Sequence, residues 1–350
     1  MPFKFFYILN FLPVTDKPKI GITLGDPNGI GPEVVIKALT DNRVFNLFTP
    51  VVYGSTRVLS FYKKQLNQEE FNYSQTKNDS LFFPKTVNVI NCWEEAMEIT
   101  PGVASKAGGK YALLSLKKSV EDLKAGVIDG LVTAPIDKNT IHGDEFPFHG
   151  HTEYLTKEFN AGESLMLLVG QKLKIGLVTE HIPIKEIAKH ITRDRVELKI
   201  RLMEMSLKKD FVIQKPKIAV LGLNPHASDE GLLGTEENEF IKPVIADLKS
   251  KGKLIMGPFP ADGFFGSGQH TKYDGIIAMY HDQGLVAFKA LEFSNGVNYT
   301  AGLPIVRTSP DHGTAYTLAG KNLSDESSIR QAIYLACDII KNRQASQQAT

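Results

Sequence analysis

Short apolar runs alternate with longer amphipathic stretches along most of the chain. The first run covers residues 19–24, and a glycine-rich turn and a helical pattern from Pro32 to Leu39 follow it. Short β-rich runs separated by helical patterns are typical of parallel strands joined by helices. Further strands are predicted at residues 50–53, 86–91 and 130–133, and helices at residues 57–66 and 110–125. This alternation predicts an α/β protein with a largely parallel sheet.

The pattern starts again after residue 153. It predicts strands at residues 165–169, 173–178, 217–221, 253–256, 275–279 and 302–307, and helices at residues 184–190, 194–208, 236–249 and 327–341. A chain of 350 residues is longer than one hydrophobic core usually organises. We therefore expect two α/β domains with the active site between them.

Three histidines each follow a predicted strand, namely His181, His226 and His281. Open α/β sheets bind ligands outside the carboxyl ends of their strands, so the three imidazoles are expected at one edge of a sheet. Three imidazole nitrogens suit a divalent metal with an open position for substrate. A single histidine at such a place is more often an isolated polar residue in a loop or cap. Its repetition at three strand ends favours metal binding.

Other polar residues border apolar segments. The ring of His151 and the hydroxyl of Thr152 could contact an oxygen-rich substrate. Lys289, Asn298 and Arg307 could bind a phosphate or carboxylate, because arginine can hold such a group with two hydrogen bonds. Each of these last three, taken alone, is by default an ordinary surface residue.

Two carboxylates and two glycine-containing loops complete the candidates. Asp262 and Asp282 lie in polar loops, and Asp282 either orients a metal-bound imidazole or caps the next helix. The turn at residues 25–31 matches neither a dinucleotide fingerprint nor a Walker loop. It either brings Asp26 and backbone N–H groups to a ligand or is a plain strand–helix turn. Residues 312–321 either allow a nucleotide to approach closely at Gly313 or simply begin a helix.

Composition narrows the function classes. The formal net charge is +1 and the basic residues are dispersed, which argues against a nucleic-acid partner. No apolar run reaches the roughly 20 residues of a membrane-spanning helix. The two cysteines, Cys92 and Cys337, form no CxxC pair, as is typical of a reducing, cytoplasmic compartment. Residues 1–17 lack a small-residue cleavage site and are expected to be an extension.

Six motifs together resemble the 4-hydroxythreonine-4-phosphate dehydrogenase family of the vitamin B6 pathway. They are GDPNGIGPE at 25–33, GHTE at 150–153, LNPH at 223–226, GPFPAD at 257–262, YHDQG at 280–284 and TSPDHGTA at 308–315. They occur in the family's order and span nearly the whole chain. The chain departs from the family in its extension and at Asn28, where many members have alanine.

The resemblance implies a two-domain fold like that of isocitrate and isopropylmalate dehydrogenases, and a homodimer. The first domain would comprise residues 18–148 plus 300–345, and the second, with the dimer interface and metal ligands, residues 149–299. A zinc, magnesium or cobalt ion would be held by His181, His226 and His281. Substrate contacts would come from His151, Thr152, Lys289, Asn298 and Arg307. Residues 312–321 resemble a nucleotide-binding loop, with cofactor contacts from His312, Gly313, Thr314 and Gly320, although Thr317 replaces a usual aspartate.

The activity implied is metal-dependent oxidation of 4-phosphooxy-L-threonine at C3 by NAD or NADP. Decarboxylation would then give 3-amino-2-oxopropyl phosphate. Lys289 and Arg307 are candidates for holding the phosphate, and Lys289, Asp262 and Asp282 are the catalytic candidates. The general base stays open between the two aspartates and a metal-bound water.

Three alternatives remain at this point. A dehydrogenase of 4-phospho-threonate or 4-phospho-erythronate would use the same motifs. A zinc hydrolase would need the three histidines but not the nucleotide loop, and a metabolite-binding protein would need no turnover.

Overall fold

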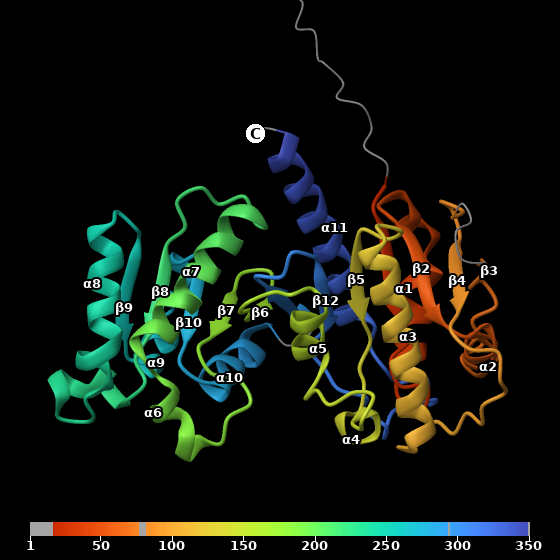
Figure 1. Ribbon diagram of the computed structural model, residues 1–350, viewed down its shortest axis with the longest axis horizontal. Helices are drawn as coiled ribbons and strands as arrows, with labels where there is room; N and C mark the ends of the chain where they lie inside the picture. The colour runs from red at the N-terminus through yellow and green to blue at the C-terminus, as the bar shows by residue number, and fades with distance from the viewer. Residues whose placement is uncertain (1–16, 77–81, 293–294, 349–350) are drawn as a thin grey trace, which may run out of the picture.

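The computed structural model describes residues 17–76, 82–292 and 295–348. Strands and helices alternate along the chain, as Figure 1 shows. The elements up to residue 141 are β1 (Lys19–Thr23), α1 (Gly31–Thr40), η1 (Asn42–Asn46), β2 (Thr49–Gly54), α2 (Thr56–Gln65), β3 (Tyr73–Gln75), β4 (Val87–Asn91), α3 (Lys106–Lys124), β5 (Gly130–Thr133) and α4 (Lys138–Ile141). This part of the chain follows the predicted alternation closely.

The rest of the chain continues the alternation, with several short helices near the strand ends. Its elements are α5 (His151–Glu158), β6 (Leu165–Val169), β7 (Lys174–Leu177), η2 (Ile184–Glu186), α6 (Ile187–His190), α7 (Arg193–Lys209), β8 (Ile218–Leu221), η3 (Pro225–Gly231), η4 (Glu237–Ile241), α8 (Lys242–Ser250), β9 (Ile255–Phe259), α9 (Ala261–Gly266), η5 (Gln269–Lys272), β10 (Gly275–Ala278), α10 (His281–Glu292), β11 (Val297–Ala301), β12 (Arg307–Pro310) and α11 (Ser327–Gln348).

The described strands form one 12-stranded sheet in the order β3-β4-β2-β1-β5-β12-β11-β6-β7-β10-β8-β9. The strands from β3 to β12 in this order are mutually parallel, and so are β7, β10, β8 and β9. Antiparallel pairing is confined to the centre, where β11 pairs with β12 and β6, and β6 pairs with β7. The prediction of an α/β protein with largely parallel strands is therefore confirmed.

Burial explains why these segments form strands. Every residue of β2, β5, β6, β8 and β10 is buried, as is typical of strands covered by helices on both faces, which are mostly apolar. Helix α3 packs on β1, β2 and β5. Helix α11, which lies in the middle of Figure 1, packs on β5, β11 and β12 and also contacts α1 and α7. The last helix thus joins the two groups of parallel strands.

The strand predicted at residues 302–307 is wrong. The structure instead has an antiparallel pair, β11 and β12, joined by a turn. Gly302 has a φ of +92°, a conformation unsuited to a strand, and Pro304 has no N–H for a strand ladder. As a result, Asn298 and Arg307 lie on two neighbouring strands at the centre of the sheet.

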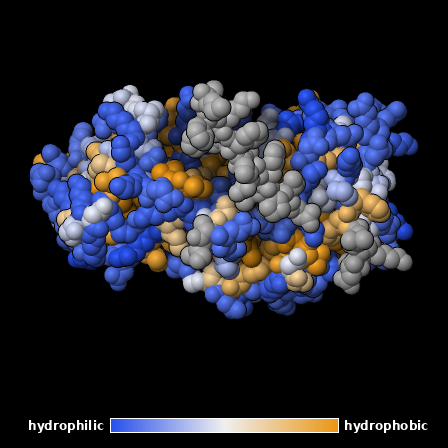
Figure 2. All heavy atoms as spheres, turned by 90° about the horizontal axis from the view of Figure 1, so that it is seen from above, coloured by the Kyte–Doolittle hydropathy of each residue, from blue (hydrophilic) through white to orange (hydrophobic). Residues whose placement is uncertain are grey.

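The surface gives two further observations. Seen from above, in Figure 2, the molecule is mostly hydrophilic, with apolar side chains gathered in a few places. Among the residues that the structure describes, no helix combines the length and apolarity needed to cross a membrane. The predicted extension over residues 1–17 lies, apart from Lys17, outside the described residues.

Candidate active site

One cavity of about 1160 Å³ lies where the ends of β5, β7, β11 and β12 meet the start of α5 and one side of α7. Many of the predicted site residues line it, although they come from distant parts of the sequence. They are His151, Thr152, His181, Asn298, Arg307, His312 and Gly313. The fold therefore brings most of the predicted substrate contacts into one space.

Arg307 is the most unusual residue of this cavity. It is 3% exposed, and its guanidinium donates hydrogen bonds only to hydroxyls, with Nη2 at 2.6 Å from Thr133 Oγ1 and Nη1 at 3.1 Å from Thr300 Oγ1. No carboxylate in the described chain pairs with it. Burial lowers the pKa of Arg307 to about 10. A buried cation without an anion is unfavourable, so the site is suited to an anionic ligand.

His151 begins α5 and lies beside this cation. Burial, and then the positive charges of Arg307 and Lys138, hold the pKa of His151 well below its usual range. The imidazole is therefore neutral at physiological pH. Its Nε2 atom is buried and has no hydrogen-bond partner among the described residues.

Two other buried polar atoms lining the cavity are also without a partner in the described chain, namely Asn298 Oδ1 and His312 Nε2. Buried polar atoms are normally hydrogen-bonded. Unpartnered atoms from β11, the start of α5 and the loop after β12 therefore indicate a polar ligand in this cavity.

The three predicted metal ligands follow neighbouring strands. Strands β7, β10 and β8 are adjacent and parallel, so their carboxyl ends share one edge of the sheet. The rings of His181 and His281 lie 5.7 Å apart. Burial, followed by the charges of Lys138, His281 and His149, lowers the pKa of His181. A neutral imidazole is the form that binds metal.

Asp282 contacts one of these histidines. Its Oδ1 lies 2.7 Å from His281 Nδ1, so a proton on Nδ1 would leave Nε2 free for a ligand. Of the two roles considered for Asp282, the structure shows the contact with the imidazole. The Asp282 carboxylate itself is exposed and is not part of the cavity lining.

The third predicted ligand, His226, follows β8. It begins a turn in which residues 226–230 all have left-handed φ values between 45° and 71°, a conformation that costs roughly 1–2 kcal/mol per residue. The buried carboxylate of Glu237 anchors the start of this turn and accepts hydrogen bonds from Leu223 N and Asn224 N, both at 2.7 Å. No group of three or more His, Cys, Asp or Glu side chains in the described residues is close enough to hold a metal ion.

Several other candidates lie outside the cavity lining. Lys289 Nζ is 3.6 Å from Asp311 Oδ2, next to His312. Asp262 is exposed in the first turn of α9. A Cβ on Gly320 would lie 2.8 Å from the Pro101 side chain, so this glycine is needed for packing.

The loop after β12 is braced by the glycine-rich turn. Thr314 O accepts a hydrogen bond from Ile30 N at 2.9 Å. Asp26 is fully buried, and its Oδ2 accepts a hydrogen bond from Tyr316 OH at 2.7 Å. Burial raises the pKa of Asp26. This turn therefore supports the neighbouring loop, and Asp26 does not face the cavity.

Comparisons with known proteins agree with this arrangement. Residues 46–336 match the family described as pyridoxal phosphate biosynthetic protein PdxA. A protein named 4-hydroxythreonine-4-phosphate dehydrogenase from Bacteroides thetaiotaomicron is 47% identical over 336 residues, which cover 95% of this chain and 92% of the relative. The chain belongs to the PdxA family. The resemblance inferred from the six motifs is thus confirmed.

The fold of this chain is also similar to those of solved structures. The crystal structure of 4-hydroxythreonine-4-phosphate dehydrogenase from Klebsiella pneumoniae aligns with a TM-score of 0.80 at 33% identity, covering 93% of this chain and 98% of that chain. An isocitrate dehydrogenase from Methylococcus capsulatus aligns with a TM-score of 0.50 at 12% identity, covering 95% of this chain and 88% of that chain. The second likeness concerns the fold alone, and it agrees with the predicted fold class.

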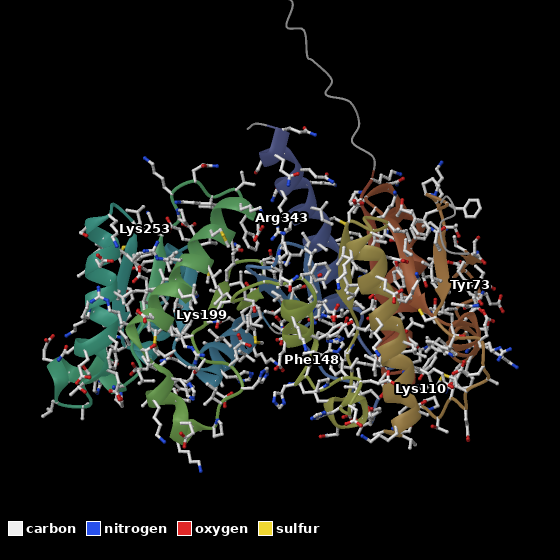
Figure 3. All side chains as sticks on the ribbon, in the orientation of Figure 1. Tyr73, Lys110, Phe148, Lys199, Lys253 and Arg343 are labelled. Carbon is white, nitrogen blue, oxygen red and sulfur yellow. The ribbon has the colours of Figure 1, made fainter. Side chains whose placement is uncertain are left out.

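Two lysines that the sequence analysis missed also line the cavity. Lys199, labelled in Figure 3 on α7, is 6% exposed and donates a hydrogen bond to Ser164 O at 2.5 Å. It lies inside an amphipathic helix, where a lysine is expected at the surface, so no signal identified it. Lys138 follows β5 as the three histidines follow their strands, and that position could have identified it.

Proposed function

We propose that the protein is a 4-hydroxythreonine-4-phosphate dehydrogenase. It would oxidise the C3 hydroxyl of 4-phosphooxy-L-threonine with NAD and release the carboxylate as carbon dioxide, giving 3-amino-2-oxopropyl phosphate. The names of its relatives support this substrate. The structural observation that carries the proposal is the buried, unpaired guanidinium of Arg307 in the main cavity.

The phosphate would bind at Arg307. A guanidinium and a phosphate form strong, charge-assisted hydrogen bonds, and this pairing would neutralise the buried cation. The unpartnered atoms His151 Nε2 and Asn298 Oδ1 would complete the polar contacts of the substrate. Lys289, held beside Asp311, would approach from the α10 side.

The histidines partly fit a divalent metal. The adjacent rings of His181 and His281 are suitable ligands, and His226 would be the third from the neighbouring strand end. A metal bound there would polarise an oxygen at the reacting carbon. Asp282 would hold His281 in the orientation that leaves Nε2 available. The roles of Lys289, Asp262 and Asp282 in catalysis remain predictions.

The loop after β12 fits a nucleotide. No described atom lies within 4 Å of the place where a Cβ on Gly313 would be, so a ligand could approach the backbone closely. His312 Nε2 is buried and lacks a partner in the described chain. NAD or NADP bound there would accept the hydride.

We further propose that the protein is a cytoplasmic homodimer. Cys92 and Cys337 are both free, as expected in a reducing compartment. Ile184, Leu232 and Val286 are 81%, 79% and 68% exposed and lie close in sequence to His181, His226 and His281. Large exposed apolar side chains beside functional loops support an interface with a second copy.

The proposal is tested by measuring NADH formation with 4-phosphooxy-L-threonine and with 4-phospho-D-threonate, each with and without a chelator. The second substrate is included because a relative from Pectobacterium atrosepticum, 36% identical over 325 residues, is named D-threonate 4-phosphate dehydrogenase. Chelator-sensitive turnover of the amino acid is the expected result. A preference for 4-phospho-D-threonate would mean that the substrate is the sugar acid and not the amino acid. Absence of NADH formation with either substrate would refute the proposed dehydrogenase activity.

A further inference from the structure

Lys138 contributes an unpaired positive charge to the cavity. It is the first residue of α4 and lines the cavity beside His149 and Gly150. Its ammonium forms neither an ion pair nor a hydrogen bond with any residue that the structure describes. The neighbouring carboxylate of Asp137 is engaged elsewhere, because it accepts a hydrogen bond from Asn139 N at 2.8 Å.

The side chain of Lys138 lies along the start of α5. Its Cε atom would be 3.7 Å from a Cβ placed on Gly150, the residue before His151. His151, His181 and Arg307 line the same cavity as Lys138, and the charge of Lys138 also lowers the pKa of the His151 imidazole. The ammonium therefore belongs to the same cavity as the Arg307 guanidinium and the His181 imidazole.

The order of polar groups along the proposed substrate indicates which of them the Lys138 ammonium would contact. The phosphate is attached to C4, the reacting hydroxyl to C3, and the carboxylate carbon is bonded to C2. If Arg307 holds the phosphate, the next polar group toward the histidines is the C3 oxygen. A cation between the two ends of the cavity is therefore best placed to contact that oxygen.

We propose that Lys138 is a further catalytic residue, whose ammonium donates a hydrogen bond to the C3 oxygen of the substrate. The proposal rests on the proposed function. In the first step, a hydride leaves C3 for NAD and the hydroxyl proton passes to water, which gives the 3-oxo acid. In the second step, the C1–C2 bond breaks and carbon dioxide leaves.

The electron pair of the broken bond forms a C2–C3 double bond, and the C3 oxygen takes the negative charge. Protonation at C2 then completes the product. An N–H donor aimed at an oxygen where charge develops stabilises the transition state more than the bound substrate. Lys138 is therefore expected to affect kcat, whereas Arg307 is expected to affect binding.

The test compares Lys138→Met and Lys138→Arg with the wild-type protein. We expect Lys138→Met to lower kcat about 100-fold, the size typical of losing one such donor, with KM changed less than about threefold. Calorimetric binding of 4-phosphooxy-L-threonine without NAD, where no turnover occurs, should be similarly unchanged. Lys138→Arg retains the charge and should recover part of kcat.

A matched control is Lys110→Met. Lys110, labelled in Figure 3 on α3, pairs with Glu95 at 3.1 Å and is not part of the cavity lining. This control should retain wild-type kcat and KM. The thermal unfolding of Lys138→Met should match that of the wild type, because the Lys138 ammonium has no intramolecular partner among the described residues.

Two results would overturn the proposal while leaving the proposed function intact. If Lys138→Met weakens calorimetric binding and raises KM with kcat unchanged, the ammonium binds an anionic group of the substrate instead. If nothing changes, it does not touch the substrate. Absence of wild-type turnover on both phosphorylated substrates would remove the proposed function, and the role of Lys138 with it.

Discussion

Replacing Arg307 with methionine should separate ligand binding from folding. Burial lowers the pKa of Arg307 from its usual value to about 10. One pKa unit corresponds to about 1.4 kcal/mol, so burying this charge costs the ligand-free protein roughly 3 kcal/mol. The cost is fully present below pH 10, because the side chain is charged in both folded and unfolded states there. It would be relieved only as the pH rises above 10.

The methionine variant loses this cost but also loses the hydrogen bonds to Thr133 and Thr300. Hydrogen bonds to charged groups contribute about 1.5–3 kcal/mol each, so losing those to the two threonines costs roughly 3–6 kcal/mol, against a relief of roughly 3 kcal/mol. We expect the free energy of unfolding of the ligand-free protein to fall by roughly 0–3 kcal/mol. Loss of the phosphate contact should weaken substrate binding by about 2–4 kcal/mol, or about 30- to 1000-fold.

Arg343 provides the matched control, because it is also buried but has a carboxylate partner. Its Nε donates to Asp210 Oδ1 at 2.7 Å, and its Nη2 donates to Tyr299 OH at 2.9 Å; the side chain is labelled in Figure 3. Removing one partner of a buried ion pair costs about 3–5 kcal/mol. Arg343→Met should therefore unfold more easily than Arg307→Met.

Denaturant unfolding without ligand, together with calorimetric titration of 4-phosphooxy-L-threonine, checks both expectations. The reasoning is refuted if Arg307→Met is destabilised as much as Arg343→Met, because Arg307 would then be a structural residue. It is also refuted if Arg307→Met binds the substrate with wild-type affinity.

Three other substitutions test separate parts of the site. His226→Ala should lose most bound metal and nearly all activity with an unchanged circular dichroism spectrum; unchanged metal content would remove His226 from the ligand set. Tyr316→Phe removes the hydrogen bond to Asp26 and should raise the KM for NAD about threefold to tenfold without changing that for substrate; an equal rise in both would contradict a local role. Asp282→Asn should weaken metal binding about tenfold or more, as typical for a residue that orients a ligand, and wild-type affinity would argue against that role.

The sequence was sufficient to predict elements whose burial is uniform. β5, at Gly130–Thr133, and β6, at Leu165–Val169, have the predicted bounds, because a buried run between polar residues allows little choice. The segment at residues 302–307 was misassigned because its apolar composition resembles a strand, whereas Gly302 and Pro304 produce a turn. Hydrophobic pattern alone does not show backbone conformation.

The candidate site likewise has features that the sequence predicts and features that it does not. The sequence shows that His181 and His281 each follow a strand. They come together because those strands, β7 and β10, are neighbours in the sheet, and the pattern of residues does not give that order. Asp26 accepts a hydrogen bond from Tyr316, which lies 290 residues away in the sequence, and no local pattern indicates this contact. The cavity position of Lys138 likewise depends on the packing of α4 against α3.

The position of the third predicted ligand, His226, depends on its turn more than on the sheet. Thr179 Oγ1 donates a hydrogen bond to Met279 O at 2.7 Å, which ties the end of β7 to the end of β10. Gln283 Nε2 donates to Gly222 O at 2.7 Å, which ties the end of β8 to the start of α10. The strand ends are therefore held in place up to Gly222, and His226 lies only four residues further along. The chain between this strand end and the His226 imidazole enters the left-handed turn at residues 226–230, so the conformation of that turn determines where the third imidazole lies.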